Sequence, residues 1–86
     1  FVGPERIFHV PSRAAALLKR ELEKLPGRIE AMEEEQAQWH GRMADPAFYR
    51  QDGAAIAHAK QRVAELTAEL EAAYRRWEEL ETILAG

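Results

Sequence analysis

The sequence predicts an all-α protein, a two-helix antiparallel coiled-coil hairpin with a helix break near Pro26 and a short helical turn at its tip. Two observations support this fold class. Apolar residues recur at alternating spacings of four and three along residues 18–43 and again along residues 56–84, which keeps one side of each helix, the seam, facing a single partner. The pattern stops at residues 44–53. With a turn there, the two seams meet when the chain folds back.

The first helix is expected at about residues 13–43, after a linker or boundary segment at residues 1–12. The linker has no apolar period and contains one glycine and two prolines. Ser12 is suited to cap the helix, because its hydroxyl can accept a hydrogen bond from a free amide of the first turn. The seam of this helix consists of Leu18, Leu22, Leu25, Ile29, Met32, Gln36, Trp39 and Met43.

Pro26 interrupts the first helix. A proline lacks the amide donor and its ring clashes with the carbonyl four residues earlier, so we expect a kink, or a restart in which Pro26 takes the first helical position. Because the seam keeps its phase across Pro26, the two pieces should stay roughly collinear.

The break at residues 44–53 carries the signals of a structured tip. Asp45 followed by Pro46 is the usual pairing of an N-cap with a first helical residue, so a short helical turn should follow. Phe48 and Tyr49 on that turn are expected to plug the end of the hairpin and to offer a tip contact, with Tyr49 the better candidate for an exposed aromatic group.

The second helix is expected at about residues 53–85, so the hairpin domain spans residues 13–86. Asp52 can cap this helix, and Gly53 can ease the chain reversal. The seam of the second helix consists of Ile56, Ala59, Val63, Leu66, Leu70, Ala73, Trp77, Leu80 and Leu84.

Charged residues beside the two seams select one register. The predicted alignment sets Trp39 against Ile56, Met32 against Val63, Gln36 against Ala59 as the one polar layer, and pairs Glu21 with Arg76, Arg28 with Glu69 and Glu35 with Arg62. A slip of one heptad would bring like charges together instead. Each exposed pair contributes only about 0.2 to 1 kcal/mol, but the register depends on the summed difference between attraction and repulsion.

Composition excludes several classes of function. The chain has 86 residues, no Cys and a net charge of −3, so disulfides and thiolate metal sites are excluded, and no apolar run approaches the roughly 20 residues of a membrane span. His9, His40 and His58 do not share a helical spacing, so no metal site is predicted. No nucleotide-binding or catalytic motif is present, and a two-helix arm is not expected to be catalytic by itself. Because the chain starts at Phe1 instead of Met, we expect it to be a piece of a longer protein.

Positive charge gathers toward the open end of the predicted hairpin. Residues 1–28 hold six basic and three acidic residues, whereas residues 29–44 hold one basic and four acidic residues. Several basic side chains remain after the register pairs are made, and they lie where phosphate contact is possible. The candidate nucleic-acid-binding residues are Arg13, Lys19, Arg20, Lys24, Arg28 and Arg75.

Three strings resemble the C-terminal coiled-coil domain of Uup-type ABC-F ATPases. They are RELEKLPGRIEAMEEEQ at residues 20–36, ADPAFYR at residues 44–50 and AELTAELEAAYRRWEELE at residues 64–81. The resemblance covers about residues 20–83. The segment before residue 20 differs, because PSRAAALLKR stands where the family usually has a strongly basic stretch.

The resemblance implies a soluble cytoplasmic bacterial protein with two upstream ATP-binding cassettes and no transmembrane domain. ATP and Mg²⁺ would belong to those cassettes, so no cofactor is expected in this fragment. The resemblance also implies a hairpin that binds nucleic acid, namely DNA, with ribosome association in the wider family. The expected partners are therefore DNA or ribosomal RNA and the cassettes of the parent protein, with the hairpin itself a monomer or weak dimer.

Two alternatives remain open from the sequence. The C-terminal arm of a valyl-tRNA synthetase has the same hairpin plan, but its tip normally continues into an Ala-Pro step, whereas Tyr49 and the string QDG follow here. A purely structural spacer or dimerisation hairpin would instead show a concentration-dependent dimer in sedimentation and no shift with DNA or ribosomes.

Overall fold

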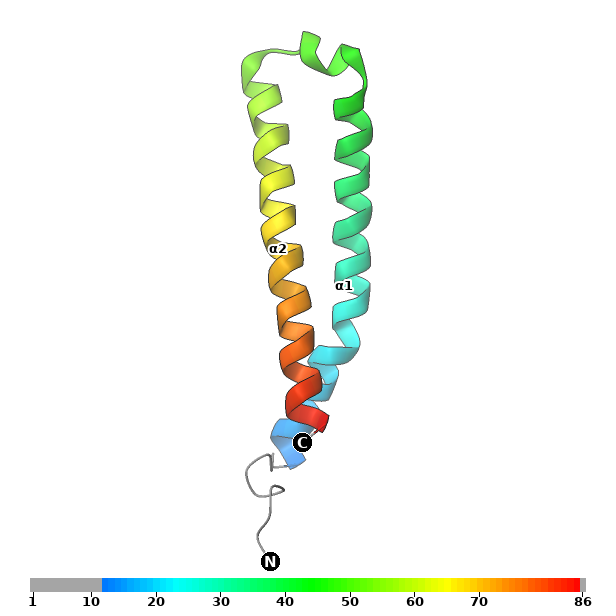
Figure 1. The fold of residues 1–86 in the computed structure, drawn as a ribbon, viewed down its shortest axis with the longest axis vertical. Helices are drawn as coiled ribbons and strands as arrows, with labels where there is room; N and C mark the ends of the chain where they lie inside the picture. The colour runs from blue at the N-terminus through cyan, green and yellow to red at the C-terminus, as the bar shows by residue number, and fades with distance from the viewer. Residues whose placement is uncertain (1–11, 86) are drawn as a thin grey trace, which may run out of the picture.

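The computed structural model describes residues 12–85 and shows two long helices joined at one end (Figure 1). Helix α1 spans Ser12–Ala44, the 3₁₀ helix η2 spans Pro46–Arg50, and helix α2 spans Gly53–Ala85. The predicted all-α hairpin and its short helical tip are confirmed. The linker at residues 1–11 and the capping side chain of Ser12 lie outside the described part.

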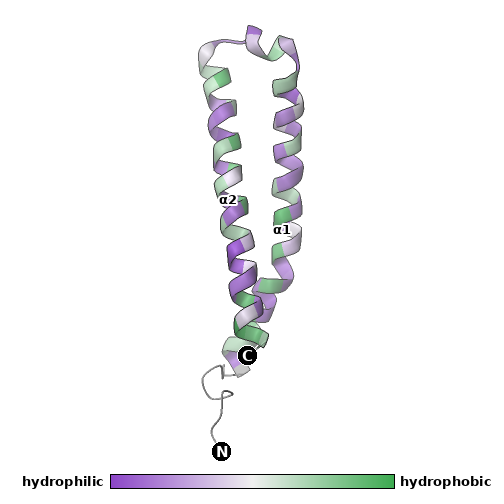
Figure 2. Cartoon of the chain, in the orientation of Figure 1, coloured by the Kyte–Doolittle hydropathy of each residue, from purple (hydrophilic) through white to green (hydrophobic). Residues whose placement is uncertain are grey.

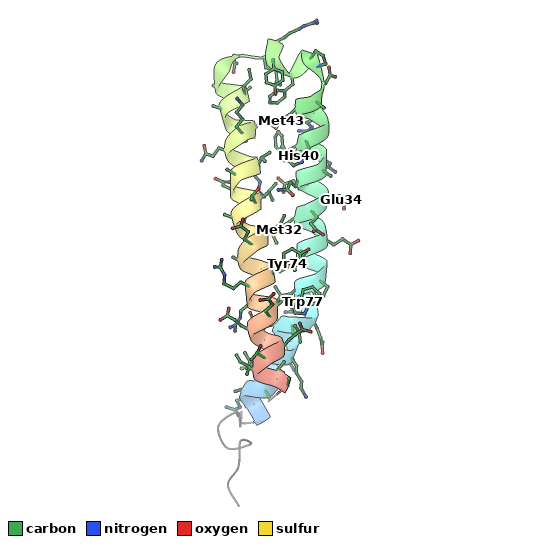
Figure 3. The ribbon with its side chains drawn as sticks, viewed as in Figure 1. Met32, Glu34, His40, Met43, Tyr74 and Trp77 are labelled. Atoms are coloured by element: carbon green, nitrogen blue, oxygen red, sulfur yellow. The ribbon has the colours of Figure 1, made fainter. Side chains whose placement is uncertain are left out.

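A single apolar seam holds the two helices together. All but one of the buried residues are predicted seam positions: Leu25, Ile29, Ala59, Leu66, Leu70, Ala73 and Leu80. Hydrophobic segments accordingly recur along both helices between hydrophilic ones (Figure 2). Figure 3 shows Met32 and Trp77 between the helices and Glu34 pointing away from them. No polar or charged side chain is buried within residues 12–85.

The open-end half of the hairpin contains the main hydrophobic cluster. Leu25 and Ile29 of α1 join Leu70, Ala73 and Leu80 of α2, and Leu18, Leu22, Met32 and Trp77 pack around them. This cluster lies on both sides of Pro26 in the sequence, so the seam continues past the proline.

Helix α1 is continuous through Pro26, which corrects the predicted break. The proline removes one amide donor and pushes away the carbonyl of Leu22, and a long helix accommodates that loss by bending. Figure 1 shows the change of direction in the cyan part of α1. The predicted kink is therefore present, whereas a restart at Pro26 is not.

Two of the three predicted register pairs are present. Arg76 Nε donates to Glu21 at 2.6 Å, and Arg62 Nε donates to Glu35 at 2.7 Å. The third pair is wrong: Glu69 lies 3.4 Å from Arg62 Nη1, and no ion pair joins it to Arg28. Arg62 can reach Glu69 because both lie on the same face of α2.

Gln36, the polar residue of the α1 seam, bonds to a residue of α2. Gln36 Nε2 donates to the hydroxyl of Thr67 at 3.0 Å, and Thr67 lies two helical turns, about 12 Å, beyond Ala59 along α2. The Glu35–Arg62 pair holds the neighbouring Gln36 near residue 61, so the Gln36 amide turns along α2 to reach Thr67, and its predicted place opposite Ala59 stays a prediction. The predicted contacts of Trp39 with Ile56 and of Met32 with Val63 stay predictions.

The tip is capped as the sequence predicts. Asp45 has extended backbone angles, and its Oδ1 accepts from the Ala47 amide at 2.9 Å, with Pro46 in the first helical position of η2. Asp52 Oδ1 accepts from the Ala55 amide at 2.7 Å and caps α2. Gly53 is already part of α2 and has no left-handed φ. The expectation that this glycine eases the chain reversal is therefore wrong.

Candidate nucleic-acid interface

The six predicted phosphate-binding residues are all exposed. Five lie on the first half of α1, and the sixth, Arg75, lies on α2. Because Arg76 is bonded to Glu21, the adjacent Arg75 lies at about the same height along the hairpin as Lys19 and Arg20. The structure therefore brings the α1 and α2 candidates to the same end of the molecule.

Three of these residues form a row. Arg20, Lys24 and Arg28 follow one another at four-residue intervals, so they lie along one face of α1. Like charges at this spacing weaken a helix slightly. The row therefore does not stabilise the helix. It presents three cations in a line to solvent.

The six residues differ from the arginines beside the seam. Arg62 and Arg76 are engaged by carboxylates, whereas none of the six candidates has a carboxylate within 4.0 Å in the described part of the chain. Their positive charge is available to an external anion. Arg28 acts at longer range, since its charge helps to lower the pKa of Glu21.

Hydrogen bonds from the seam arginines hold two carboxylates in the ionised form. The Arg62 guanidinium lowers the pKa of Glu35 to about 2, with a further contribution from the Trp39 indole N–H. The Arg76 guanidinium lowers the pKa of Glu21 in the same way. These pairs fix the heights of the two helices and leave the basic face of α1 free.

The two aromatic residues of the tip have different environments. Tyr49 is 56% exposed and can contact a partner, but Phe48 is only 6% exposed. Their rings meet edge to face with centroids 5.1 Å apart. Phe48 therefore closes the tip as predicted. The expectation that Phe48 also contacts a partner is wrong, because its ring is covered.

Some side-chain arrangements were not predicted from the sequence. The Arg42 guanidinium lies 4.9 Å from the centroid of the Trp39 ring, and the Tyr74 hydroxyl donates to Glu33 at 2.8 Å. The three-residue spacing of Trp39 and Arg42 on one helix face was a usable signal for the first contact. The hydrogen bond between Tyr74 and Glu33 joins different helices, so it could be identified only once the fold was known.

Neither a metal centre nor a membrane span is found in the described residues. Within residues 12–85, no group of three or more His, Asp or Glu side chains is placed to hold a metal ion. Over the same range, no helix combines the length and apolar character needed to cross a membrane.

The fold and the charge distribution define a helical-hairpin arm with an exposed basic face at its open end. The chain belongs to the ABC transporter C-terminal domain family, whose pattern matches residues 16–82. It is similar to two proteins of Haemophilus influenzae, the ATP-binding protein Uup-like and the ATP-binding protein Uup. The identity to each is 41% over 63 residues.

The resemblance to Uup-type ABC-F proteins seen in the three strings is thus confirmed. The match covers 73% of this chain but only 14% of the Uup-like relative and 10% of the Uup relative. This chain therefore corresponds to a small part of those proteins. No solved structure matches.

Proposed function

We propose that this hairpin is a nucleic-acid-binding arm of an ABC-F ATPase that acts in the cytoplasm. The exposed basic face of α1, unpaired with any described carboxylate, is the observation that carries the proposal. Arg20, Lys24 and Arg28 contact phosphates from one helix face, and Arg13, Lys19 and Arg75 assist at the same end. The ligand is DNA or ribosomal RNA, because phosphate contacts alone carry no base information.

The parent protein supplies the chemistry in this proposal. ATP and Mg²⁺ bind to its cassettes, which lie outside this chain, and the arm carries no cofactor and no catalytic residue. The resemblance of the chain to two proteins named as ATP-binding supports this division of labour. Membership of an ABC family also favours this function over the arm of a valyl-tRNA synthetase.

Fluorescence titration with labelled duplex and branched DNA at two salt concentrations tests the phosphate contacts. The affinity should fall with salt, since each phosphate contact releases counterions. The double variant Arg20→Gln, Lys24→Gln should bind more weakly and reduce the slope of log affinity against log salt by about two. The matched control Arg20→Lys, Lys24→Arg keeps both charges at the same exposed positions and should retain most of the slope.

Three results would reject the phosphate role of the α1 face. They are an absence of binding, binding that does not respond to salt, and an equal loss in the control variant. A purely structural hairpin would show a concentration-dependent dimer in sedimentation and no shift with DNA.

A further inference from the structure

A groove of about 780 Å³ lies under the tip, away from the basic face of α1. This volume is in the range of about 300 to 1,000 Å³ that small-molecule sites occupy. All three elements and the turn before η2 contribute to its lining, which includes Gln38, Trp39, Arg42, Asp45, Phe48, Gln51 and His58. The groove thus combines aromatic rings, one planar cation, one carboxylate and two amides.

Arg42 and Trp39 form a prepared stacking platform in this groove. The guanidinium lies over the indole ring, 4.9 Å from its centroid, and Arg42 is exposed. The indole is held from two other sides: its N–H donates to Glu35 at 3.1 Å, and the His58 ring meets it edge-on at 6.4 Å. The outer side of the Arg42 guanidinium is therefore a positioned, planar surface available to a ligand.

The charges around the groove favour an anionic ligand. The carboxylates of Asp45 and Asp52 both accept backbone amides in capping bonds, and Asp52 lies at the positive end of the α2 dipole. Arg42, Arg50 and Lys60 are exposed and have no carboxylate within 4.0 Å in the described part of the chain. Residues 38–60 hold these three cations and only the two aspartates, so the net charge of the tip is +1.

We propose that the groove binds an unpaired base of a looped or single-stranded nucleic acid, stacked on the Arg42 guanidinium. Unpaired bases are recognised by stacking on aromatic rings or guanidinium planes and by hydrogen bonds to their edges. Gln38 and Gln51 supply amide groups beside the platform. An apolar protein side chain would instead cover the Arg42 guanidinium without accepting hydrogen bonds from its N–H groups. The proposal rests on the proposed function and adds a base site at the opposite end of the arm from the phosphate contacts.

The test compares two labelled stem-loops that differ only in whether the loop nucleotides carry bases or are abasic. Both probes keep the same stem and the same phosphates, so binding by the α1 face is equal for both. The 86-residue chain should bind the loop with bases about tenfold more tightly, as one stacked base provides. DNA and RNA versions of both probes show which nucleic acid supplies the base.

Two substitutions assign the effect to Arg42. Arg42→Lys keeps the charge but loses the plane, so the preference for the loop with bases should disappear. Arg50→Lys is the matched control and should keep that preference, because Arg50 is an exposed arginine of η2 that does not line the groove. Circular dichroism checks that both variants remain helical.

A second measurement observes Trp39 directly. The chain has two tryptophans, so Trp77→Phe leaves Trp39 as the only indole emitter. The loop with bases should quench its emission, and the abasic loop should not. Anisotropy of the labelled probes with the unsubstituted chain gives the affinities even if the Trp77 variant fails to fold.

Several outcomes would overturn the base site. Equal affinities for the two loops would reject it, and salt-dependent duplex binding would then leave the proposed function standing. A retained preference in Arg42→Lys would reject the guanidinium platform. Trp39 emission that changes with protein concentration alone would show that a second copy of the chain fills the groove. If no probe binds, both proposals fail.

Discussion

The carboxylate of Glu35 binds side chains of both helices. It accepts from Arg62 Nε at 2.7 Å, from Arg62 Nη2 at 2.9 Å and from the Trp39 indole at 3.1 Å. One residue therefore links the seam of α1 to α2 and also holds the tryptophan of the tip groove. Two-pronged binding of an arginine gives this pair a defined geometry that most exposed pairs lack.

We expect Glu35→Gln to lower the melting temperature by a few degrees. The substitution keeps the size of the side chain but removes the charge that binds Arg62. Glu34→Gln is the matched control, because Glu34 is the adjacent residue, is exposed and points away from the helices (Figure 3). Thermal unfolding followed by circular dichroism measures both variants. Equal melting temperatures for the two would contradict a role for the pair.

The same pair makes a prediction about pH. The pKa of Glu35 falls from an ordinary 4.5 to about 2 in the folded chain, because Arg62 and Trp39 stabilise the ionised form. A lowered pKa means that the folded state releases its proton more readily than the unfolded state, so the added stability is complete above 4.5 and is lost as the pH falls toward 2. The difference in melting temperature between the unsubstituted chain and Glu35→Gln should therefore shrink across this interval. A difference that stays constant down to pH 2 would contradict the assignment.

For single residues, the sequence predicted which charged residues lie beside the seam better than it predicted their ion-pair partners. Heptad positions identified Glu21, Glu35, Arg62 and Arg76 as seam-flanking residues, and both resulting pairs are present. The partner of Glu69 was wrong, because long side chains also choose among neighbours on their own helix. Heptad position does not specify that choice.

Among the elements, α1 contains an avoidable weakness next to Pro26. Gly27 follows the proline inside the helix, where glycine costs conformational entropy relative to alanine. A methyl group added at Gly27 would meet nothing within 4 Å. The glycine is therefore not required by close packing.

We expect Gly27→Ala to raise the free energy of unfolding by about 0.5 to 1 kcal/mol, the usual advantage of alanine in a helix interior. Urea unfolding followed by circular dichroism measures the change. Leu25→Gly is the opposite control, since it both empties a buried position and adds a second glycine to the same turn, and it should destabilise strongly. A decrease for Gly27→Ala would mean that the bend at Pro26 needs glycine.

The element boundaries were predictable because they have local causes. The caps at Asp45 and Asp52 and the end of the apolar pattern fixed the tip almost to the residue. The continuous seam indicated that the two pieces around Pro26 align, but the sequence alone did not decide whether the lost hydrogen bond ends the helix or only bends it. The hydrogen bond of Gln36 to Thr67 also required the fold, since Thr67 lies beside the seam and is not part of its apolar pattern.

As a whole molecule, the hairpin depends on a single layer of buried side chains. Two packed helices enclose no second layer, and a core of this size provides only about 3 to 5 kcal/mol. Leu66 and Leu80 are fully buried within that layer. The loss of one such residue therefore removes a large part of the total stability.

We expect Leu66→Ala to unfold most of the chain at 25 °C, because truncating a buried leucine costs about 2 to 5 kcal/mol. The helical signal in circular dichroism should fall by more than half. Leu17→Ala is the matched control: Leu17 is 58% exposed, and its truncation should leave the signal nearly unchanged. If Leu66→Ala remained fully helical, the seam would not be the main source of stability.

The candidate interface divides into a part that the sequence predicts and a part that it does not. The basic row on α1 is visible in the sequence because it lies on one helix at regular spacing. The tip groove is not visible, because its lining comes from α1, η2 and α2 and forms only when the chain has reversed. A residue pattern within one helix can therefore predict a surface on that helix, but not a surface that several elements form together.

The length of the hairpin gives it a mechanical property. Each helix has 33 residues and is therefore about 50 Å long, and the seam and ion pairs tie the two into one beam. A tilt of about 10° at the open end carries the tip through about 9 Å. The bend of α1 near Pro26 lies about 21 Å from that end, so a small change in its angle is magnified along the remaining part of the beam. The hairpin thus acts as a lever, which converts small rotations at its base into large displacements of Tyr49 and the groove beside it.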